Sequence, residues 1–152
     1  MVQLKKENTM LRIEKSIKVN CTPEKAFAFA TDFSNAAKWQ VGLIEAKILS
    51  EGPIGVGTTY NWVSKFLGQK MEMKSEVIVW EPPTRYEYKG VASPFPITGG
   101  FSFKAEDGGT LVTLFGEAEP GGFFKLAEGM LKGQMDKQLE DTLQALKKAL
   151  EG

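Results

Sequence analysis

The chain has 152 residues, of which 42% are hydrophobic and 25% charged, and its 19 basic residues equal its 19 acidic ones. These values are ordinary for a globular domain, and the balanced charge lacks the basic excess expected of a nucleic-acid-binding protein. The sequence contains no histidine and a single cysteine, Cys21, which excludes imidazole-based catalysis, an internal disulfide and the common zinc sites. We therefore expect no metal and no other cofactor.

The N-terminal residues show no targeting signal. Two early lysines are not followed by the apolar run of a secretory signal, and no stretch of the chain approaches the length of a membrane-spanning segment. We expect residues 1–10 to be a disordered or extended leader and residues 11–152 to form a single domain. The expected location is cytoplasmic.

One strand and two short helices are predicted after this leader. In the stretch LRIEKSIKVN, apolar side chains recur at every second position, as on a strand with one buried face. Thr22 is a typical N-cap and Pro23 a typical first helical residue, so we expect a helix from there to about Asp32. Ser34 is expected to cap a second short helix that ends near Trp39.

Six further strands and one long helix complete the chain. Short turns rich in glycine and proline favour antiparallel hairpins, since parallel pairing needs long crossovers. The strands are expected at residues 43–50, 58–67, 69–80, 84–91, 95–106 and 110–119. The helix has an apolar stripe that steps by three or four residues, formed by Phe124, Ala127, Leu131, Met135, Leu139, Leu143, Leu146 and Leu150. This order predicts an α+β fold in which a curved antiparallel sheet wraps around the C-terminal helix.

The predicted inner face of the sheet is rich in aromatic residues and methionine. In the stretch MEMKSEVIVW, for example, Met71 and Met73 alternate with charged side chains. Aromatic rings are bulky and methionine is flexible, so these residues could fill a core or line a cavity. Any single residue of this kind is more often part of a core.

The strand at 110–119 is apolar on both faces. We expect Val112 and Leu114 to face inward, because Gly116 and Ala118 continue that face. Two glutamates continue the opposite face, which favours solvent there.

Two glycine pairs bear on the choice between core and cavity. Gly129 and Gly133 lie inside the long helix, where each costs roughly 0.5–1 kcal/mol relative to alanine. They indicate either unfilled space or a close approach of the helix to the sheet. Gly99 and Gly100 lie in mid-strand, where glycines mark a bulge, a bend or an unfilled face.

Three stretches resemble the START-like SRPBCC superfamily, and most closely its polyketide cyclase/dehydrase-like branch. They are IEKSIKVNCTPEKAFAFATDFSNAAKW, VIVWEPPTRYEYKG, and GGTLVTLFGEAEP with the amphipathic helix after it, within residues 11–150. The resemblance implies a helix-grip fold, as in START and Bet v 1-like proteins, with a deep hydrophobic cavity between a seven-stranded sheet and the helix. Members bind lipids, sterols, polyketides, quinones or plant hormones, and a minority catalyse cyclisation or dehydration. Membership alone therefore does not decide function.

The resemblance places the side chains of the inner face on the wall of this cavity. The expected ligand-binding residues are Trp39, Tyr60, Trp62, Met71, Met73, Ser75, Tyr86, Phe101, Phe103, Phe124 and Met130. Trp39 could act as a gate or simply pin its helix to the sheet. Hydroxyl groups on the inner face, including Ser64 and Tyr88, are candidate anchors for a polar ligand group. Lys15 is another, unless a local bulge turns it toward solvent.

The leading hypothesis is a protein that binds or carries a hydrophobic small molecule, such as a lipid, a quinone or a polyketide-like compound. This hypothesis would require a void of at least roughly 300 Å³, the low end for ligand pockets. The expected partner is this ligand, and no nucleic-acid partner is expected. Whether the chain forms a homodimer is left open.

Two alternatives belong to other classes. The first is a cyclase/dehydratase-type enzyme that uses a tyrosine hydroxyl, or a carboxylate of raised pKa such as Asp32 or Glu117, to move protons. No paired carboxylates support it, so no catalytic residue is assigned. The second is a protein-interaction module with a filled core, for which Val63, Ile78 and Trp80 on the outer face are the only indication.

Overall fold

The computed structural model describes residues 11–66, 68–92, 97–118 and 128–151, and the structural statements below refer to these residues. Seven described strands form one antiparallel sheet in the order β1-β7-β6-β5-β4-β3-β2. The strands are β1 (Leu11–Val19), β2 (Leu43–Ile48), β3 (Thr59–Phe66), β4 (Gln69–Glu81), β5 (Arg85–Ala92), β6 (Ile97–Glu106) and β7 (Gly109–Ala118). The helices are α2 (Pro23–Ala30), the 3-10 helix η1 (Phe33–Asn35), α3 (Ala36–Trp39) and α5 (Glu128–Glu151).

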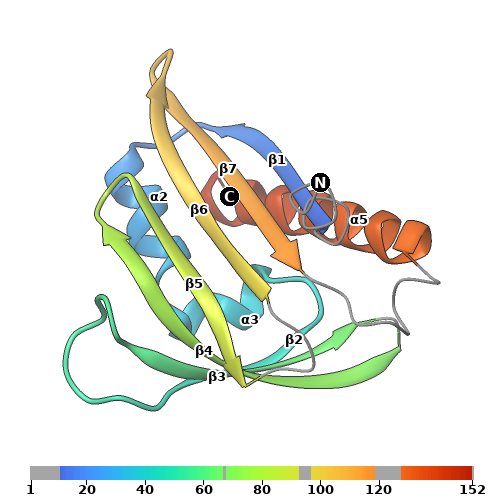
Figure 1. Cartoon of the computed structure of the whole chain (residues 1–152). Coiled ribbons are helices and arrows are strands. Elements are labelled where there is room, and N and C mark those ends of the chain that lie inside the picture. The colour runs from blue at the N-terminus through green and yellow to red at the C-terminus, as the bar shows by residue number, and fades with distance from the viewer. Residues whose placement is uncertain (1–10, 67, 93–96, 119–127, 152) are drawn as a thin grey trace, which may run out of the picture.

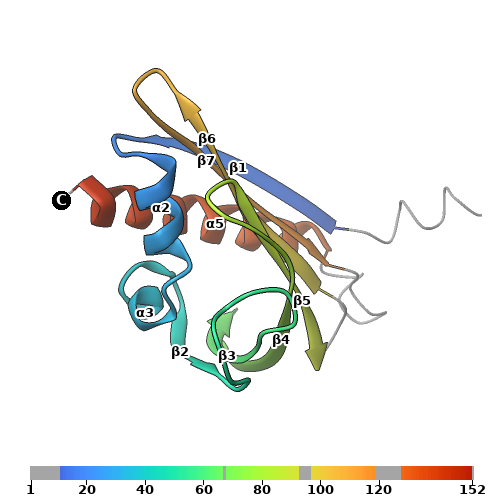
Figure 2. The same cartoon turned by 90° about the vertical axis from the view of Figure 1, so that its left-hand side faces the viewer.

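The sheet curls around the helices. Figure 1 shows α5 running behind β1 and β7, with α2 and α3 beside it. In Figure 2 the three α-helices lie on the same, concave side of the sheet. This is the α+β helix-grip fold that the resemblance implied. The leader expected at residues 1–10 lies outside the described residues.

Caps fix the two short helical segments after β1. The Thr22 hydroxyl accepts a hydrogen bond from the Lys25 backbone N–H at 3.2 Å, which confirms Thr22 as the N-cap of α2. The cap expected at Ser34 is wrong. The Asp32 carboxylate accepts from the Ser34 backbone N–H at 3.0 Å and caps η1, because the chain makes a 3-10 turn before α3 begins.

The strand orientations at the sheet's β1 edge follow the predicted alternation. Val112 and Leu114 of β7 are buried, as predicted. The pairing of β1 with β7 is continuous from Leu11 to Val19, so there is no bulge at Lys15. Instead, the Lys15 ammonium reaches the carboxylate of Asp136 on α5 at 3.2 Å.

A β-bulge in β4 overturns one expectation about the outer face. The register with β5 shifts between Val77 and Val79, and this shift reverses the alternation beyond it. Trp80 therefore pairs with Tyr86 and packs inward, its ring centroid 5.1 Å from that of Phe27. Since Val63 is also buried, the outer apolar surface expected from Val63, Ile78 and Trp80 is not formed.

The two halves of α5 differ in their packing. Leu143, Leu146 and Leu150 are buried in the hydrophobic core, as their spacing predicted. Gly133 is exposed, and a Cβ built on it would meet no atom within 4 Å, so it does not serve a close approach to the sheet. Gly129 lies in the first turn, and its surroundings are outside the description. None of the helices in the described ranges has the length and apolar character of a membrane span.

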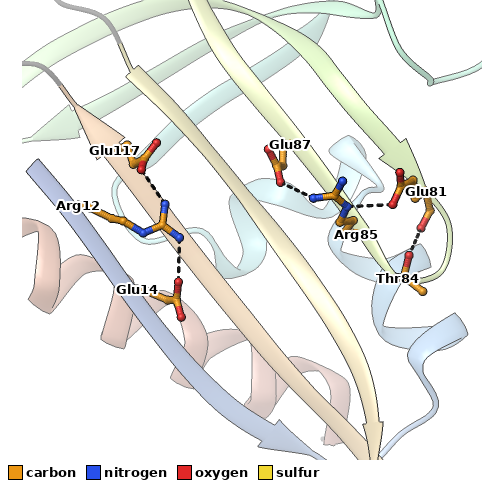
Figure 3. A network of polar contacts seen from close by, with 7 residues as sticks. All are labelled: Arg12, Glu14, Glu81, Thr84, Arg85, Glu87 and Glu117. Carbon is orange, nitrogen blue, oxygen red and sulfur yellow. Dashed lines mark hydrogen bonds and ion pairs between the residues drawn. The ribbon is translucent and has the colours of Figure 1, made fainter. Parts of the chain in front are cut away.

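Ion pairs cover the outer face of the sheet (Figure 3). The Arg12 guanidinium bridges Glu14 and Glu117, each at 2.8 Å. Arg85 bridges Glu81 at 2.8 Å and Glu87 at 3.0 Å. These pairs are solvent-exposed and each contributes little stability, about 0–1 kcal/mol. Among the described residues, no such ion pair lies at the centre of the inner face.

Candidate functional site

A cavity of about 170 Å³, here called the main cavity, lies between the inner face of the sheet and residues 135–142 of α5. The strands supply mainly apolar side chains to its wall and α5 supplies both apolar and polar ones. The described wall residues are Gln40, Trp62, Ser64, Met71, Met73, Tyr88, Ile97, Thr98, Phe101, Leu114, Phe115, Gly116, Ala118, Met135, Gln138, Leu139 and Thr142. None of them is charged, so the wall suits an apolar, uncharged occupant.

A smaller space of about 30 Å³, here called the annex, adjoins the main cavity. The two spaces share Gln40, Trp62, Met73 and Tyr88 as wall residues. The remaining described residues of the annex wall are Ala30, Phe33, Ala36, Tyr60 and Tyr86. The annex thus brings together all three tyrosines of the sequence, in a volume sufficient for about two water molecules.

Aromatic packing limits the size of the main cavity. Phe27 of α2 inserts its ring edge-on against Trp80, Tyr86 and Phe103, with centroid distances of 5.1, 6.1 and 5.4 Å. The Tyr86 ring stacks on Phe101 at 5.5 Å. These contacts fill the end of the sheet–helix space that lies beneath α2. The volume left open is below roughly 300 Å³, the low end for ligand pockets.

A volume of this size still accommodates a small ring system. A dry engineered cavity of about 150 Å³ in another protein binds benzene. The main cavity can therefore enclose a one-ring molecule, or the ring end of a longer molecule. The volume that the binding hypothesis required is not reached, because Phe27 and Trp80, which were not assigned to the inner face, occupy part of the space.

The structure sorts the eleven expected ligand-binding residues into three groups. The first group lines the main cavity, the annex or both, and consists of Tyr60, Trp62, Met71, Met73, Tyr86 and Phe101. The second group is buried without lining either space, and consists of Trp39, Ser75 and Phe103. For the third group, Phe124 lies outside the described residues and Met130 lies in α5 with its side chain outside the description.

Trp39 packs as a core residue. Its ring centroid lies 5.7 Å from that of Phe101 and 6.4 Å from that of Phe29, and only 2% of the residue is exposed. This placement fits the interpretation that Trp39 pins α3 to the sheet. It does not fit the interpretation that Trp39 is a gate.

The three tyrosine hydroxyls stay protonated over a wide pH range. Burial raises the pKa of Tyr88 to about 12 and raises the pKa of Tyr60 and of Tyr86 well above the usual value. Ser75, opposite Tyr60 in the β3–β4 register, is fully buried and its hydroxyl makes no hydrogen bond of normal geometry with a described residue. The annex is thus bordered by neutral hydroxyl groups that can donate hydrogen bonds.

The carboxylates are poorly placed for acid–base chemistry. Hydrogen bonds from the Ser34 side chain and backbone lower the pKa of Asp32, the opposite of what a proton donor needs. Glu117 is engaged with Arg12 on the outer face. In the described ranges, no group of three or more cysteine or acidic side chains is arranged to hold a metal ion.

Two polar residues of α5 hold the connection between α3 and β2 against the main cavity. The Gln138 side-chain amide donates to the Val41 carbonyl at 3.0 Å, and the Val41 backbone N–H donates to the Thr142 hydroxyl at 3.4 Å. Gly42 follows with a φ of +85°, and a Cβ there would lie 2.9 Å from the Lys65 carbonyl oxygen. These contacts fix one side of the cavity wall.

Only some of the wall residues that were not assigned to the cavity could have been found from a pattern in the sequence. Met135 and Leu139 belong to the apolar stripe of the helix, and they could have been found by continuing the cavity assignment along it. Gln138 and Thr142 are one helical turn apart and therefore share a face. That spacing alone does not distinguish them from surface residues.

Comparisons with known proteins agree with this architecture. A family model described as "Polyketide cyclase / dehydrase and lipid transport" matches residues 10–151. A comparison with curated protein sequences gave no significant match. Among solved structures, the chain is similar to the Zhui aromatase/cyclase from a Streptomyces species, with a TM-score of 0.80 and 16% identity over 93% of this chain and 94% of that one.

Two further solved structures are similar over nearly their whole length. A START superfamily protein from Mycobacterium smegmatis has a TM-score of 0.77 and 18% identity, covering 93% of this chain and 97% of that one. A Thermus thermophilus protein has a TM-score of 0.78 and 20% identity, with coverage of 93% and 97%. At these identities the likeness establishes the fold alone.

Proposed function

The chain belongs to the polyketide cyclase / dehydrase and lipid transport family of the START-like SRPBCC superfamily, and we propose that it binds or carries a hydrophobic small molecule in the main cavity. The observation that carries the proposal is the uncharged, mainly apolar wall around about 170 Å³ between the sheet and α5. The family typically binds hydrophobic ligands, which agrees with this wall. The cytoplasmic location expected from the sequence stays a prediction.

The size of the main cavity limits which ligands can fit. It accommodates one ring, so a compact aromatic compound or the ring end of a lipid, quinone or polyketide-like molecule would fit. Removal of apolar surface from water would drive binding, at about 25 cal/mol per Å². Trp62, Met71 and Met73 on the sheet and Leu139 on α5 would provide most of the apolar contact.

Binding is favoured over catalysis by the state of the ionisable groups. An efficient general acid has a pKa near the working pH, whereas burial moves the pKa of Tyr60, Tyr86 and Tyr88 away from neutrality. These hydroxyls are suited to orient a ligand and poorly suited to transfer a proton.

Two glycines provide a matched pair of variants to test the proposal. A Cβ on Gly116 would meet only the Met135 methyl group, at 3.7 Å, so the larger side chain of Gly116→Leu would extend into the main cavity. Gly133→Leu adds the same side chain on the exposed face of α5, where a Cβ meets nothing within 4 Å. Both variants should fold, and only the first should reduce the cavity.

The experiment is a titration with isopropylbenzene followed by protein NMR chemical shifts. We expect saturable binding to the unchanged chain and to Gly133→Leu, with affinity at least about tenfold lower for Gly116→Leu, in line with the cost of overpacking. A native mass spectrum of the protein from its own organism should show an adduct that is lost on denaturation. Failure of isopropylbenzene to bind the unchanged chain, or equal binding by both variants, would refute the proposed site.

A further inference from the structure

The annex differs chemically from the main cavity that it adjoins. Tyr60, Tyr86 and Tyr88 contribute to its wall, and Gln40 adds an amide. The wall that it shares with the main cavity is formed by Gln40, Trp62, Met73 and Tyr88. A molecule that fills the main cavity therefore has hydrogen-bonding groups next to one end of it and mainly apolar groups along the rest.

The tyrosine rings are held in fixed positions, so their hydroxyls are preorganised. The Tyr60 centroid lies 6.0 Å from Trp62, 6.4 Å from Tyr88 and 4.6 Å from Phe33, which stands edge-on to it. Tyr86 is stacked on Phe101. Fixed donors lose little entropy when they bind a ligand, which strengthens selectivity for a matching group.

The polar groups around the annex are all uncharged. No lysine, arginine, aspartate or glutamate is among the described residues of either wall. Lys15, the one cationic candidate from the sequence, is paired with Asp136 at 3.2 Å and lines neither space. An ionised ligand group would thus lose its hydration without gaining a partner of opposite charge, which is strongly unfavourable.

The buried hydroxyl of Ser75 adds an independent observation. Ser75 lies opposite Tyr60 in the β3–β4 register and is fully buried, and its hydroxyl lies near the Tyr60 hydroxyl without a hydrogen bond of normal geometry to a described residue. Buried hydroxyl groups without a partner are uncommon, because each one costs desolvation energy. Because Ser75 lines neither space, its hydroxyl adjoins Tyr60 and is not itself a contact for a ligand in the annex.

We propose that the annex selects ligands whose ring bears an uncharged hydrogen-bond acceptor, a carbonyl oxygen above all, which the tyrosine hydroxyls bind while the ring occupies the main cavity. This inference rests on the proposed function and specifies its ligand class as neutral aryl ketones or related carbonyl compounds. The annex volume of about 30 Å³ accommodates a group of that size, and a donor-lined space favours an acceptor.

Three probes with the same number of non-hydrogen atoms test the inference. Acetophenone carries the neutral carbonyl, isopropylbenzene has nearly the same shape without it, and benzoate carries a charge. We expect acetophenone to bind about 2- to 12-fold more tightly than isopropylbenzene, the ratio that corresponds to one net hydrogen bond of roughly 0.5–1.5 kcal/mol. Benzoate is expected to show no measurable binding at pH 8.

Hydroxyl deletions locate the interaction. In Tyr60→Phe and Tyr88→Phe the ratio of acetophenone affinity to isopropylbenzene affinity should fall toward one. The isopropylbenzene affinity itself should stay unchanged. Ser16→Ala is the control, because the Ser16 hydroxyl pairs with Thr113 on the exposed face and Ser16 lines neither space. Its preference for acetophenone should be that of the unchanged chain.

Each outcome decides a different question. If acetophenone and isopropylbenzene bind equally, or if benzoate binds best, the inference is overturned while the proposed function stands. If the preference survives in both tyrosine variants, the annex is not where the carbonyl binds, and the inference is again overturned. If no probe binds at all, the proposed function fails together with it.

Discussion

Tyr88 of β5 lies directly over Gly99 of β6, its partner in the sheet register. A Cβ on Gly99 would come within 2.7 Å of the Tyr88 hydroxyl oxygen and 2.9 Å of the adjoining ring carbon. The glycine therefore provides the space that lets the Tyr88 ring lie against the sheet between the main cavity and the annex. Gly99 is thus a position of the inner face where the Tyr88 ring takes the place of a side chain.

A pair of alanine substitutions tests this relationship. Gly99→Ala should displace the Tyr88 ring and lower the free energy of unfolding by about 1–3 kcal/mol, the usual cost of overpacking. Gly116, which pairs with Gly99 across β6 and β7, is the control, since the one described atom that a Cβ there meets within 4 Å is the Met135 methyl carbon, at 3.7 Å. Gly116→Ala should change stability by less than about 1 kcal/mol. Urea denaturation measures both, and equal effects would contradict the contact.

The inward position of Trp80 gives a second prediction. Trp80→Ala removes a ring that packs against Phe27 and Tyr86, and should lower the free energy of unfolding by about 3 kcal/mol or more. Because the ring is not part of an outer surface, the size of the protein in light scattering should not change. Loss of a concentration-dependent oligomer in this variant would instead support the interaction-module alternative.

The buried tyrosines predict a loss of stability in alkali. An unfolded tyrosine ionises near its ordinary pKa of about 10, whereas burial raises the pKa of Tyr88 to about 12. The folded state therefore retains a proton that the unfolded state releases, so this contribution to stability is complete below pH 10 and is lost as the pH rises toward 12. Denaturation at a series of pH values should show the decline, with a smaller slope in Tyr88→Phe. An absorbance titration that detects a tyrosinate below pH 10 would contradict it.

The hydrogen bonds around Val41 predict a local effect. Thr142→Val keeps the shape of the side chain but removes the acceptor of the Val41 N–H, and should cost about 0.5–1.5 kcal/mol. The Val41 amide should then exchange with solvent faster than in the unchanged chain. Ser16→Ala is a control, because the Ser16 hydroxyl pairs with Thr113 on the exposed face. Unchanged exchange at Val41 in Thr142→Val would show that the contact does not hold this segment.

The sequence by itself determined the elements and most of their faces, because these depend on local covalent geometry. Side chains alternate on a strand with a period of two, so Tyr60, Met73 and Phe101 could be assigned to the inner face before any pairing was known. The period of a helix likewise assigned Leu143 and Leu146 to the core. Together with the motifs of the resemblance, these patterns were sufficient for the helix-grip fold.

Only the tertiary structure decided which of these inward residues face open space. The bulge between Val77 and Val79 depends on the pairing of β4 with β5, and no alternation within one strand predicts the inward turn of Trp80. Phe27 fills one end of the sheet–helix space because α2 lies over it, and the Tyr88 hydroxyl lies over β6 because its partner there is a glycine. Cavity volume is a small difference between the volume that the elements enclose and the volume of the side chains that fill it. It is therefore set by the positions of whole elements and by side-chain rotamers, which a local pattern does not contain.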